Sequence, residues 1–141
     1  MDLCYYTGHE RVPSVATYRY PSEAVGMTQR RAGTAAAGLT ASLFAVEVPS
    51  DDHPIGMGRV IRDGERVFFQ VSDIVEVPAH RRRGAGRAIM TRITTYLRTH
   101  APDNASINLI TDGGSHYLHR KFGFVATAPG AIGMKSPLES R

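Results

Sequence analysis

Two glycines follow three consecutive arginines at the point where a predicted strand gives way to a predicted helix. The segment reads Pro78-Ala79-His80-Arg81-Arg82-Arg83-Gly84-Ala85-Gly86-Arg87. Glycines let neighbouring backbone N–H groups turn toward one point without a side chain in the way. The start of a helix adds unpaired N–H donors and the positive end of the helix dipole. This combination predicts a cradle for a phosphate or pyrophosphate, and the arginines would add charge-assisted contacts.

Known phosphate-binding loops narrow the interpretation of this segment. A P-loop needs Gly-Lys-Ser/Thr after its glycines, and the chain has none there. A dinucleotide fingerprint needs a third glycine three residues after Gly86, where the chain has Ile89. A tight turn beside a solvated arginine face also fits the six-residue pattern. The segment alone therefore leaves anion binding and a plain turn open.

A helix and a series of strands would position this cradle. Residues 86–98 predict the clearest helix, because apolar side chains recur along one face of it. These apolar residues are Ile89, Met90, Ile93, Tyr96 and Leu97. Further helices are expected at Pro13–Tyr20, Ala35–Leu43 and Ser115–Lys121. Strands are expected at Phe44–Val48, Ile55–Arg62, Val67–Val71 with its continuation Asp73–Val77, Ala105–Thr111 and Phe124–Ala126, with Ala131–Lys135 closing a last hairpin.

The order of these elements predicts one α/β domain of the α+β type, covering residues 1–141. The strand–helix–strand step through residues 86–98 implies a parallel crossover, whereas the other connections favour antiparallel pairing. Asp63-Gly64 is a typical hairpin turn between two of the strands. We expect a mixed, mostly antiparallel central sheet of about six to seven strands, flanked by helices.

Composition sets the broad class of the protein. The 141 residues carry a net charge of +4, which favours anionic partners. Cys4 is the single cysteine, so neither an internal disulfide nor a thiolate zinc cluster can form, and we predict no metal site. The N-terminal residues resemble no signal peptide, and no apolar run approaches the ~20 residues of a membrane span. We therefore expect a cytoplasmic protein.

Three segments resemble one known family. Arg81-x-x-Gly84-x-Gly86, after Pro78 and before an amphipathic helix, resembles the acetyl-CoA-binding motif of the GNAT superfamily of N-acetyltransferases. Leu118–Phe124 looks like the family's Leu/Phe-Tyr-x-Lys-x-Gly-Phe segment. Ile55–Val60 is similar to the family's strand before the cofactor strand. The resemblance extends from about Phe44 to Lys135, which implies a cofactor-binding core at 44–135 and substrate-side helices at 1–43.

The resemblance implies a role for each matching position. Backbone groups of Val75, Glu76 and Val77 would pair with the pantetheine arm of acetyl-CoA as an added strand does. Backbone N–H groups around the cradle would hold the pyrophosphate; the implied residues are Arg81, Arg82, Arg83, Gly84, Ala85, Gly86 and Arg87. Asn108, on the neighbouring strand, is a candidate for substrate or cofactor contact. The acetyl group would move to a primary amine of a small molecule or peptide by direct attack.

The catalytic residues are the part of the resemblance where this chain departs from the pattern. The family usually has a tyrosine, proposed as the acid for the leaving thiolate, where this chain has His119. Imidazole has a suitable pKa for that role, although His119 is equally compatible with a structural position. Tyr117 is the alternative acid. Asp73 and Glu76 are the candidate general bases on the cofactor strand, and each is also compatible with a structural ion pair.

Two other functions stay open from the sequence. A catalytically weak acyl-CoA sensor on the same fold would explain His119 in place of tyrosine. A basic nucleic-acid-binding module would explain the arginines, although aromatic residues for base stacking are not interleaved with them. We expect a small-molecule amine as the partner, without nucleic acid or membrane, and a homodimer is possible.

Overall fold

The computed structural model describes Gly8, Glu10 and residues 32–49, 54–64, 67–77, 83–111 and 115–140. The elements in chain order are α2 (Ala32–Thr40), β1 (Phe44–Val48), β2 (Gly56–Arg62), β3 (Phe68–Glu76), α3 (Ala85–His100), β4 (Ser106–Leu109), α4 (His116–Arg120) and the 3-10 helix η2 (Pro137–Ser140). The helix predicted at Pro13–Tyr20 lies outside the described residues. No helix in the described part of the chain is long and apolar enough to cross a membrane.

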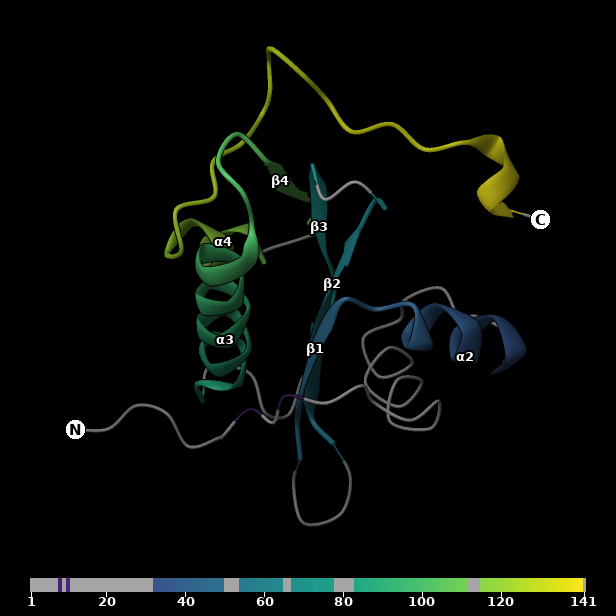
Figure 1. Cartoon of the computed structure of the whole chain (residues 1–141), viewed down its shortest axis with the longest axis vertical. Coiled ribbons are helices and arrows are strands. Elements are labelled where there is room, and N and C mark those ends of the chain that lie inside the picture. Colours follow the sequence, from purple (N-terminus) through teal and green to yellow (C-terminus); the bar gives the residue numbers. More distant parts are fainter. Residues whose placement is uncertain are drawn as a thin grey trace.

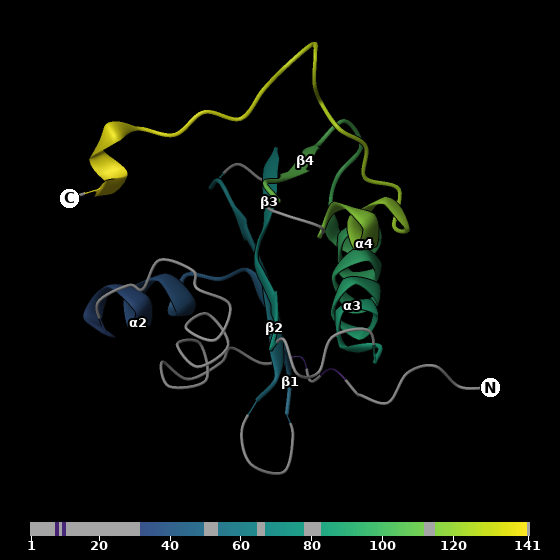
Figure 2. The ribbon, with the colours of Figure 1, turned by 180° about the vertical axis from the view of Figure 1, so that it is seen from behind.

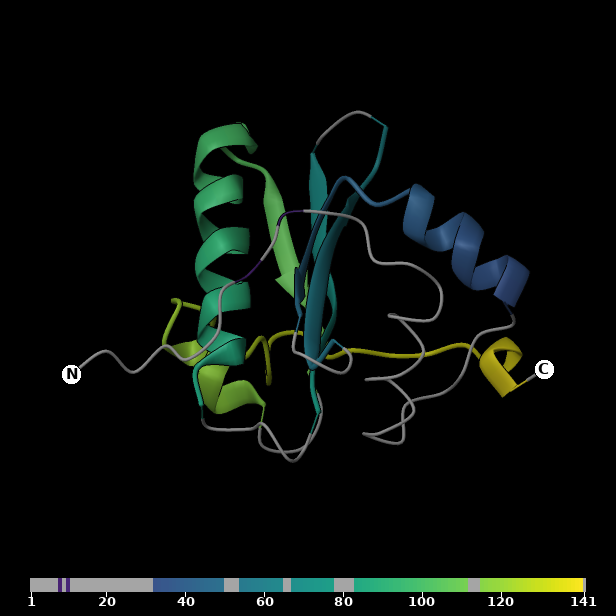
Figure 3. The same cartoon turned by 90° about the horizontal axis from the view of Figure 1, so that it is seen from below.

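The four strands form one sheet in the order β1-β2-β3-β4 (Figure 1). β1 pairs antiparallel with β2, and β2 pairs antiparallel with β3. β4 pairs parallel with β3, so α3 is the crossover between them, as the sequence predicts. Figure 3 shows α3 and α2 on opposite sides of this sheet. The mixed, mostly antiparallel α+β architecture is therefore confirmed.

The core lies between the sheet and α3. The predicted apolar stripe of α3 is buried at Ile89, Met90, Ile93 and Leu97. Its fifth member, Tyr96, is half-buried and its ring contacts that of Phe44 of β1 in a tilted arrangement, with centroids 4.3 Å apart. Burial of an amphipathic face of this kind supplies most of the stability of a helix in a globular domain.

A glycine in β2 allows α3 to approach the sheet closely. A Cβ atom added to Gly58 would clash with Ile74 of β3 and would lie 2.6 Å from Cγ2 of Ile89. Gly56 is in a similar position, because its Cβ would lie 3.2 Å from Cδ1 of Ile89. The glycines of the Ile55–Val60 segment therefore set the distance between β2 and α3.

A β-bulge interrupts β3 at Asp73. The register between β2 and β3 shifts between Met57 and Arg59, and Asp73 has a positive φ of 56°. An extra residue of this kind reverses which side chains face each side of the sheet. Before the bulge Phe69 and Val71 pack in the core against α3, whereas after it Ile74 points that way. The bulge therefore also turns Glu76, two residues after Ile74, toward α3.

Arg59 of β2 holds the bulge in place. Its Nε donates to Oδ2 of Asp73 at 2.6 Å, and both side chains are mostly buried. Its NH1 group donates to the carbonyl of Gly38 at 2.9 Å and lies 3.2 Å from Oγ of Ser42. One guanidinium thus connects the bulge of β3 to the end of α2 and to the turn before β1.

The predicted number of strands is wrong for the described residues, where the structure has four. Residues 124–126 and 131–135, predicted as strands, pair with no strand of the described chain. The chain instead leaves the domain after α4 in an extended course, seen from behind in Figure 2. Smaller differences are the start of α2 at Ala32 rather than Ala35 and the shorter β4.

The Arg59–Asp73 ion pair makes a prediction about stability. Asn tolerates positive φ, so Asp73→Asn should keep the bulge while leaving the mostly buried guanidinium without a carboxylate partner. We expect a loss of roughly 1.5–3 kcal/mol in the free energy of unfolding, the usual contribution of a hydrogen bond to a charged group. Urea unfolding measures this loss. The control is Asp103→Asn on an exposed turn, and equal stability of the two variants would show that the ion pair does not hold the bulge.

Candidate functional site

The two strands at the end of the sheet separate at the bulge. β3 and β4 pair from Phe68↔Ser106 to Val71↔Leu109, and β3 then continues to Glu76 without β4 beside it. In the described part of the chain, the edge of β3 from Ser72 to Glu76 therefore has no strand partner on that side. An unpaired edge presents backbone N–H and C=O groups to a ligand that can add as a strand.

Hydrogen bonding identifies which of the three predicted residues face the open edge. The N–H of Val77 donates to the carbonyl of Ile55 at 2.8 Å, which directs it toward β2. The carbonyl of Val75 also lies against β2, because it would be 3.3 Å from a Cβ on Gly56. Backbone groups of successive strand residues point to alternate edges. The N–H and C=O of Glu76, between these two residues, therefore point to the open edge.

The glycines predicted for the cradle form the start of α3. Gly84 is the N-cap residue in the left-handed region, with φ 98°, and its carbonyl accepts the first helical bond, from Ala88 N. A side chain at this φ is strained, so the turn into α3 requires glycine. Arg83 and Arg87 are exposed at either side of this turn, whereas Arg81 and Arg82 lie outside the described residues.

The carboxylate of Glu76 lies at the same helix start. Its Oε2 accepts a hydrogen bond from the N–H of Gly86 at 3.0 Å. A Cβ added to Gly86 would be 2.6 Å from Oε1 of Glu76 and 2.8 Å from Cδ2 of Leu118. A side chain at position 86 would therefore displace the side chains of Glu76 from β3 and Leu118 from α4. Ala85, between the two glycines, is fully buried.

His119 is buried in α4, with 4% of its surface exposed. Its Nδ1 has no hydrogen-bond partner among the described residues. Burial lowers the pKa of His119 below its ordinary 6.5, and the nearby His116 lowers it further. A lowered pKa means that the imidazole is mostly neutral at pH 7. The rings of His119 and Phe124 form an edge-type contact, with centroids 6.3 Å apart.

The remaining predicted side chains have other surroundings. Tyr117 is 64% exposed, and its ring contacts that of its neighbour His116. The amide of Asn108 on β4 accepts a hydrogen bond from Nε2 of Gln70 on β3 at 3.3 Å. Gln70 alternates with the core residues Phe69 and Val71, so this amide pair lies on the sheet face away from α3.

Arg59 is the residue that the sequence analysis missed. The sequence feature that could have pointed to Arg59 is an arginine inside a glycine-rich apolar strand. The neighbouring predicted strand carries Asp73 as a possible partner. The ion pair between them means that Asp73, predicted as a candidate base, also has a structural role. Glu76, the other candidate base, has its carboxylate bonded to the start of α3.

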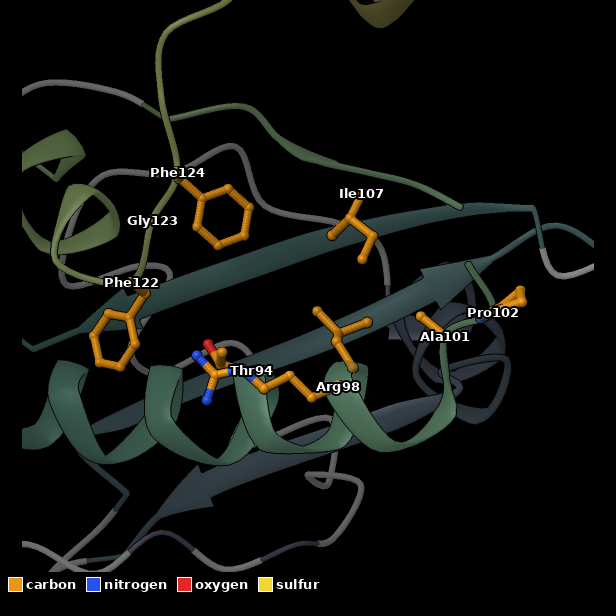
Figure 4. A pocket seen from close by; sticks show the side chains of 9 residues that line it. Thr94, Arg98, Ala101, Pro102, Ile107, Phe122, Gly123 and Phe124 are labelled. Atoms are coloured by element: carbon orange, nitrogen blue, oxygen red, sulfur yellow. The ribbon is translucent and has the colours of Figure 1, made fainter. Parts of the chain in front are cut away.

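A cavity of about 360 Å³ lies between the C-terminal half of α3 and β4 (Figure 4). Leu97 and Arg98 of α3, Ile107 of β4, and Phe122 and Phe124 after α4 are among its walls. The cavity is mainly apolar and is separate from the predicted cofactor cradle, which lies at the opposite end of α3.

Comparisons with known proteins agree on one family. The model of the acetyltransferase (GNAT) family matches residues 10–124. A solved structure from meticillin-resistant Staphylococcus aureus, a protein of unknown function described as a probable acetyltransferase, is 30% identical with a TM-score of 0.86. The match covers 93% of this chain and 98% of that one. A comparison with curated proteins gives no significant sequence match.

More distant solved structures share the fold. A GNAT-family protein from Streptococcus pneumoniae is 20% identical with a TM-score of 0.76, covering 93% of this chain and 96% of that one. Glucosamine-6-phosphate N-acetyltransferase from Arabidopsis thaliana is 11% identical with a TM-score of 0.65, covering 92% and 97%. The fold, the family-model match and the Staphylococcus aureus relative together show that this chain belongs to the GNAT acetyltransferase family, whose members generally use acetyl-CoA as co-substrate.

Proposed function

We propose that this protein transfers the acetyl group of acetyl-CoA to a primary amine of a small molecule or peptide by direct attack. The observation that carries the proposal is the open edge of β3 at Glu76, which adjoins the glycine-initiated start of α3. One ligand with an amide-containing arm and a pyrophosphate would engage both features. Acetyl-CoA has both parts.

The start of α3 fits a pyrophosphate in three respects. Gly84 allows the sharp turn, and Gly86 lacks a side chain that would cover the backbone. The N–H groups in the first helical turn have no partner within the helix, and the helix dipole favours an anion there. The exposed Arg83 and Arg87 add positive charge beside them. The carboxylate of Glu76 already accepts one of these donors, so it would compete with the pyrophosphate for the helix start.

The backbone of Glu76 would orient the pantetheine arm. Its N–H and C=O face the open edge and can exchange hydrogen bonds with amide groups of a ligand. When bound, acetyl-CoA supplies the activated acetyl thioester. Separation of β3 and β4 after the Val71↔Leu109 pair would give an amine access to the thioester. We propose that Asn108 and Gln70, on the sheet face away from α3, contact that amine.

His119 is the side chain we propose to carry the proton. Its lowered pKa favours the neutral imidazole, which accepts a proton before it can donate one. We propose that Nδ1, without a partner in the described chain, takes the proton as the amine attacks and delivers it to the departing thiolate. Asp73 and Glu76 are weaker candidates because each carboxylate already has a structural partner. Tyr117 is the alternative acid.

Ligand binding and turnover test the proposed function in two steps. Binding of CoA to the native state should raise the melting temperature progressively with CoA concentration. Release of free thiol from acetyl-CoA should then occur with at least one member of a panel of primary amines. No thermal shift at millimolar CoA would refute the proposal. Binding of CoA with no thiol release for any amine would favour the acyl-CoA sensor, whereas tight binding of duplex DNA or RNA instead would favour the nucleic-acid module.

The lowered pKa of His119 also makes a prediction about the pH dependence of stability. Between the folded pKa and the ordinary 6.5, the unfolded state binds more protons, so the free energy of unfolding rises with pH. The stability that neutral His119 contributes should therefore be lost as the pH falls below 6.5 and through the lowered pKa of the folded protein. Urea unfolding at several pH values should show a shallower dependence for His119→Gln than for the wild type. His100→Gln, at an exposed position of α3, is the control. Parallel curves for wild type and His119→Gln would contradict the assignment.

A further inference from the structure

The cavity between α3 and β4 has two polar side chains of α3, Thr94 and Arg98, in an otherwise apolar lining. Oγ1 of Thr94 is buried and has no hydrogen-bond partner among the described residues. A buried hydroxyl without a partner lowers stability, so native proteins rarely contain one. A hydroxyl in the wall of a cavity can bond to a molecule that occupies the cavity. Thr94 therefore indicates an occupant with a polar atom on its α3 side.

Arg98 determines the charge of that polar atom. Residues four apart share a face of a helix, and helical side chains lean toward the N-terminus. The Arg98 side chain accordingly extends back along α3 toward Thr94 (Figure 4). Within the described part of the chain Arg98 has no ion-pair partner. A guanidinium and a hydroxyl on one wall are both donors for a carboxylate, and the bond from the guanidinium is charge-assisted.

The other walls of the cavity suit an apolar group. Leu97 of α3, Ile107 of β4, and Phe122 and Phe124 after α4 contribute them. A bound water needs two to four polar partners, which these walls lack, whereas apolar cavities of this kind take up apolar molecules. The two aromatic rings would pack on an aliphatic or aromatic body. The lining therefore fits a molecule with one carboxylate and an apolar remainder.

The volume of the cavity limits the size of such a molecule. About 360 Å³ is near the lower end of the range for ligand pockets. At ~30 Å³ per atom, the volume of a water molecule in the liquid, it holds on the order of 12 non-hydrogen atoms. Ile107 is 39% exposed and Arg98 is exposed, so a ligand can enter from solvent beside them. A small free acid fits this space better than a two-chain lipid does.

We propose that this cavity binds a small apolar carboxylic acid, whose carboxylate contacts Arg98 and Thr94 and whose body packs against the aromatic wall. A phosphate ester would bring a second negative charge into a largely apolar space, which is costly without a second cation. A primary amine would be repelled by the guanidinium. A neutral apolar molecule would leave the Thr94 hydroxyl without a partner.

This site is distinct from the cofactor cradle. Gly86 and Arg98 are about 18 Å apart along the axis of α3, at ~1.5 Å per residue. The inference goes beyond acetyl transfer and does not depend on it. The acid should therefore bind with the same affinity in the presence and absence of CoA.

Calorimetric titration of the full chain with phenylbutyrate tests the site, because this acid has about the size that the cavity holds. We expect a dissociation constant of roughly 10 µM to 1 mM, as for other ligands of this size. The neutral amide of the same shape, phenylbutyramide, should bind at least about tenfold more weakly, because it forms no charge-assisted bond with a guanidinium. Equal affinity for acid and amide, or no binding of the acid at about ten times the upper limit of that range, would overturn the proposal.

Substitutions locate the bound carboxylate. Arg98→Gln should weaken binding of the acid at least about tenfold and leave binding of the amide nearly unchanged. Arg62→Gln, at an exposed position of β2, removes the same charge outside the cavity lining and should change neither affinity. Thr94→Val should weaken binding of the acid, yet raise the melting temperature of the protein without ligand, because it removes an unpartnered buried hydroxyl. Unchanged affinity of Arg98→Gln for the acid, or displacement of the acid by CoA, would show that the acid binds elsewhere.

Discussion

The ion pair between Arg59 and Asp73 fixes the geometry on which the rest of the site depends. Asp73 has a positive φ, which is uncommon outside glycine, and the guanidinium of Arg59 holds its carboxylate at 2.6 Å. The bulge reverses the alternation of β3, so that Ile74 and Glu76 point toward α3. It also adjoins the point at which β4 stops pairing with β3. The bulge at Asp73 therefore places the open edge of β3 beside the start of α3.

The carboxylate of Glu76 and the pyrophosphate of a bound ligand would compete for the start of α3. The N–H of Gly86 donates to Glu76, and the helix dipole favours that carboxylate. A pyrophosphate at the same place would gain the same dipole and would meet the repulsion of Glu76. We therefore expect Glu76 to limit the affinity for CoA while it stabilises the protein without ligand. This competition follows from the carboxylate of Glu76, which lies within hydrogen-bond distance of the N–H of Gly86.

Local patterns predicted the elements that depend on local chemistry. The stripe of α3, the antiparallel strands and the glycines that start α3 were correct because periodicity and backbone freedom are readable from neighbouring residues. The bulge was not predicted, because it depends on Arg59 and Asp73, which are 14 residues apart. The sequence therefore suggested Asp73 as a base and did not indicate its ion pair. Residues 131–135 have the alternation of a strand but pair with no strand in the described chain, because alternation alone does not specify a partner strand. The assigned roles of His119, Tyr117 and Asn108 remain predictions.

The affinity of CoA for Glu76→Gln tests the central claim most directly. Glutamine keeps an acceptor for the N–H of Gly86 but removes the negative charge from the start of α3. Calorimetric titration should give a dissociation constant roughly fivefold lower than that of the wild type, equivalent to about 1 kcal/mol between charges ~4 Å apart in a watery environment. Asp103→Asn, which removes a carboxylate far from the cradle, should leave the affinity unchanged. Equal or weaker binding by Glu76→Gln would mean that the pyrophosphate does not lie at the start of α3.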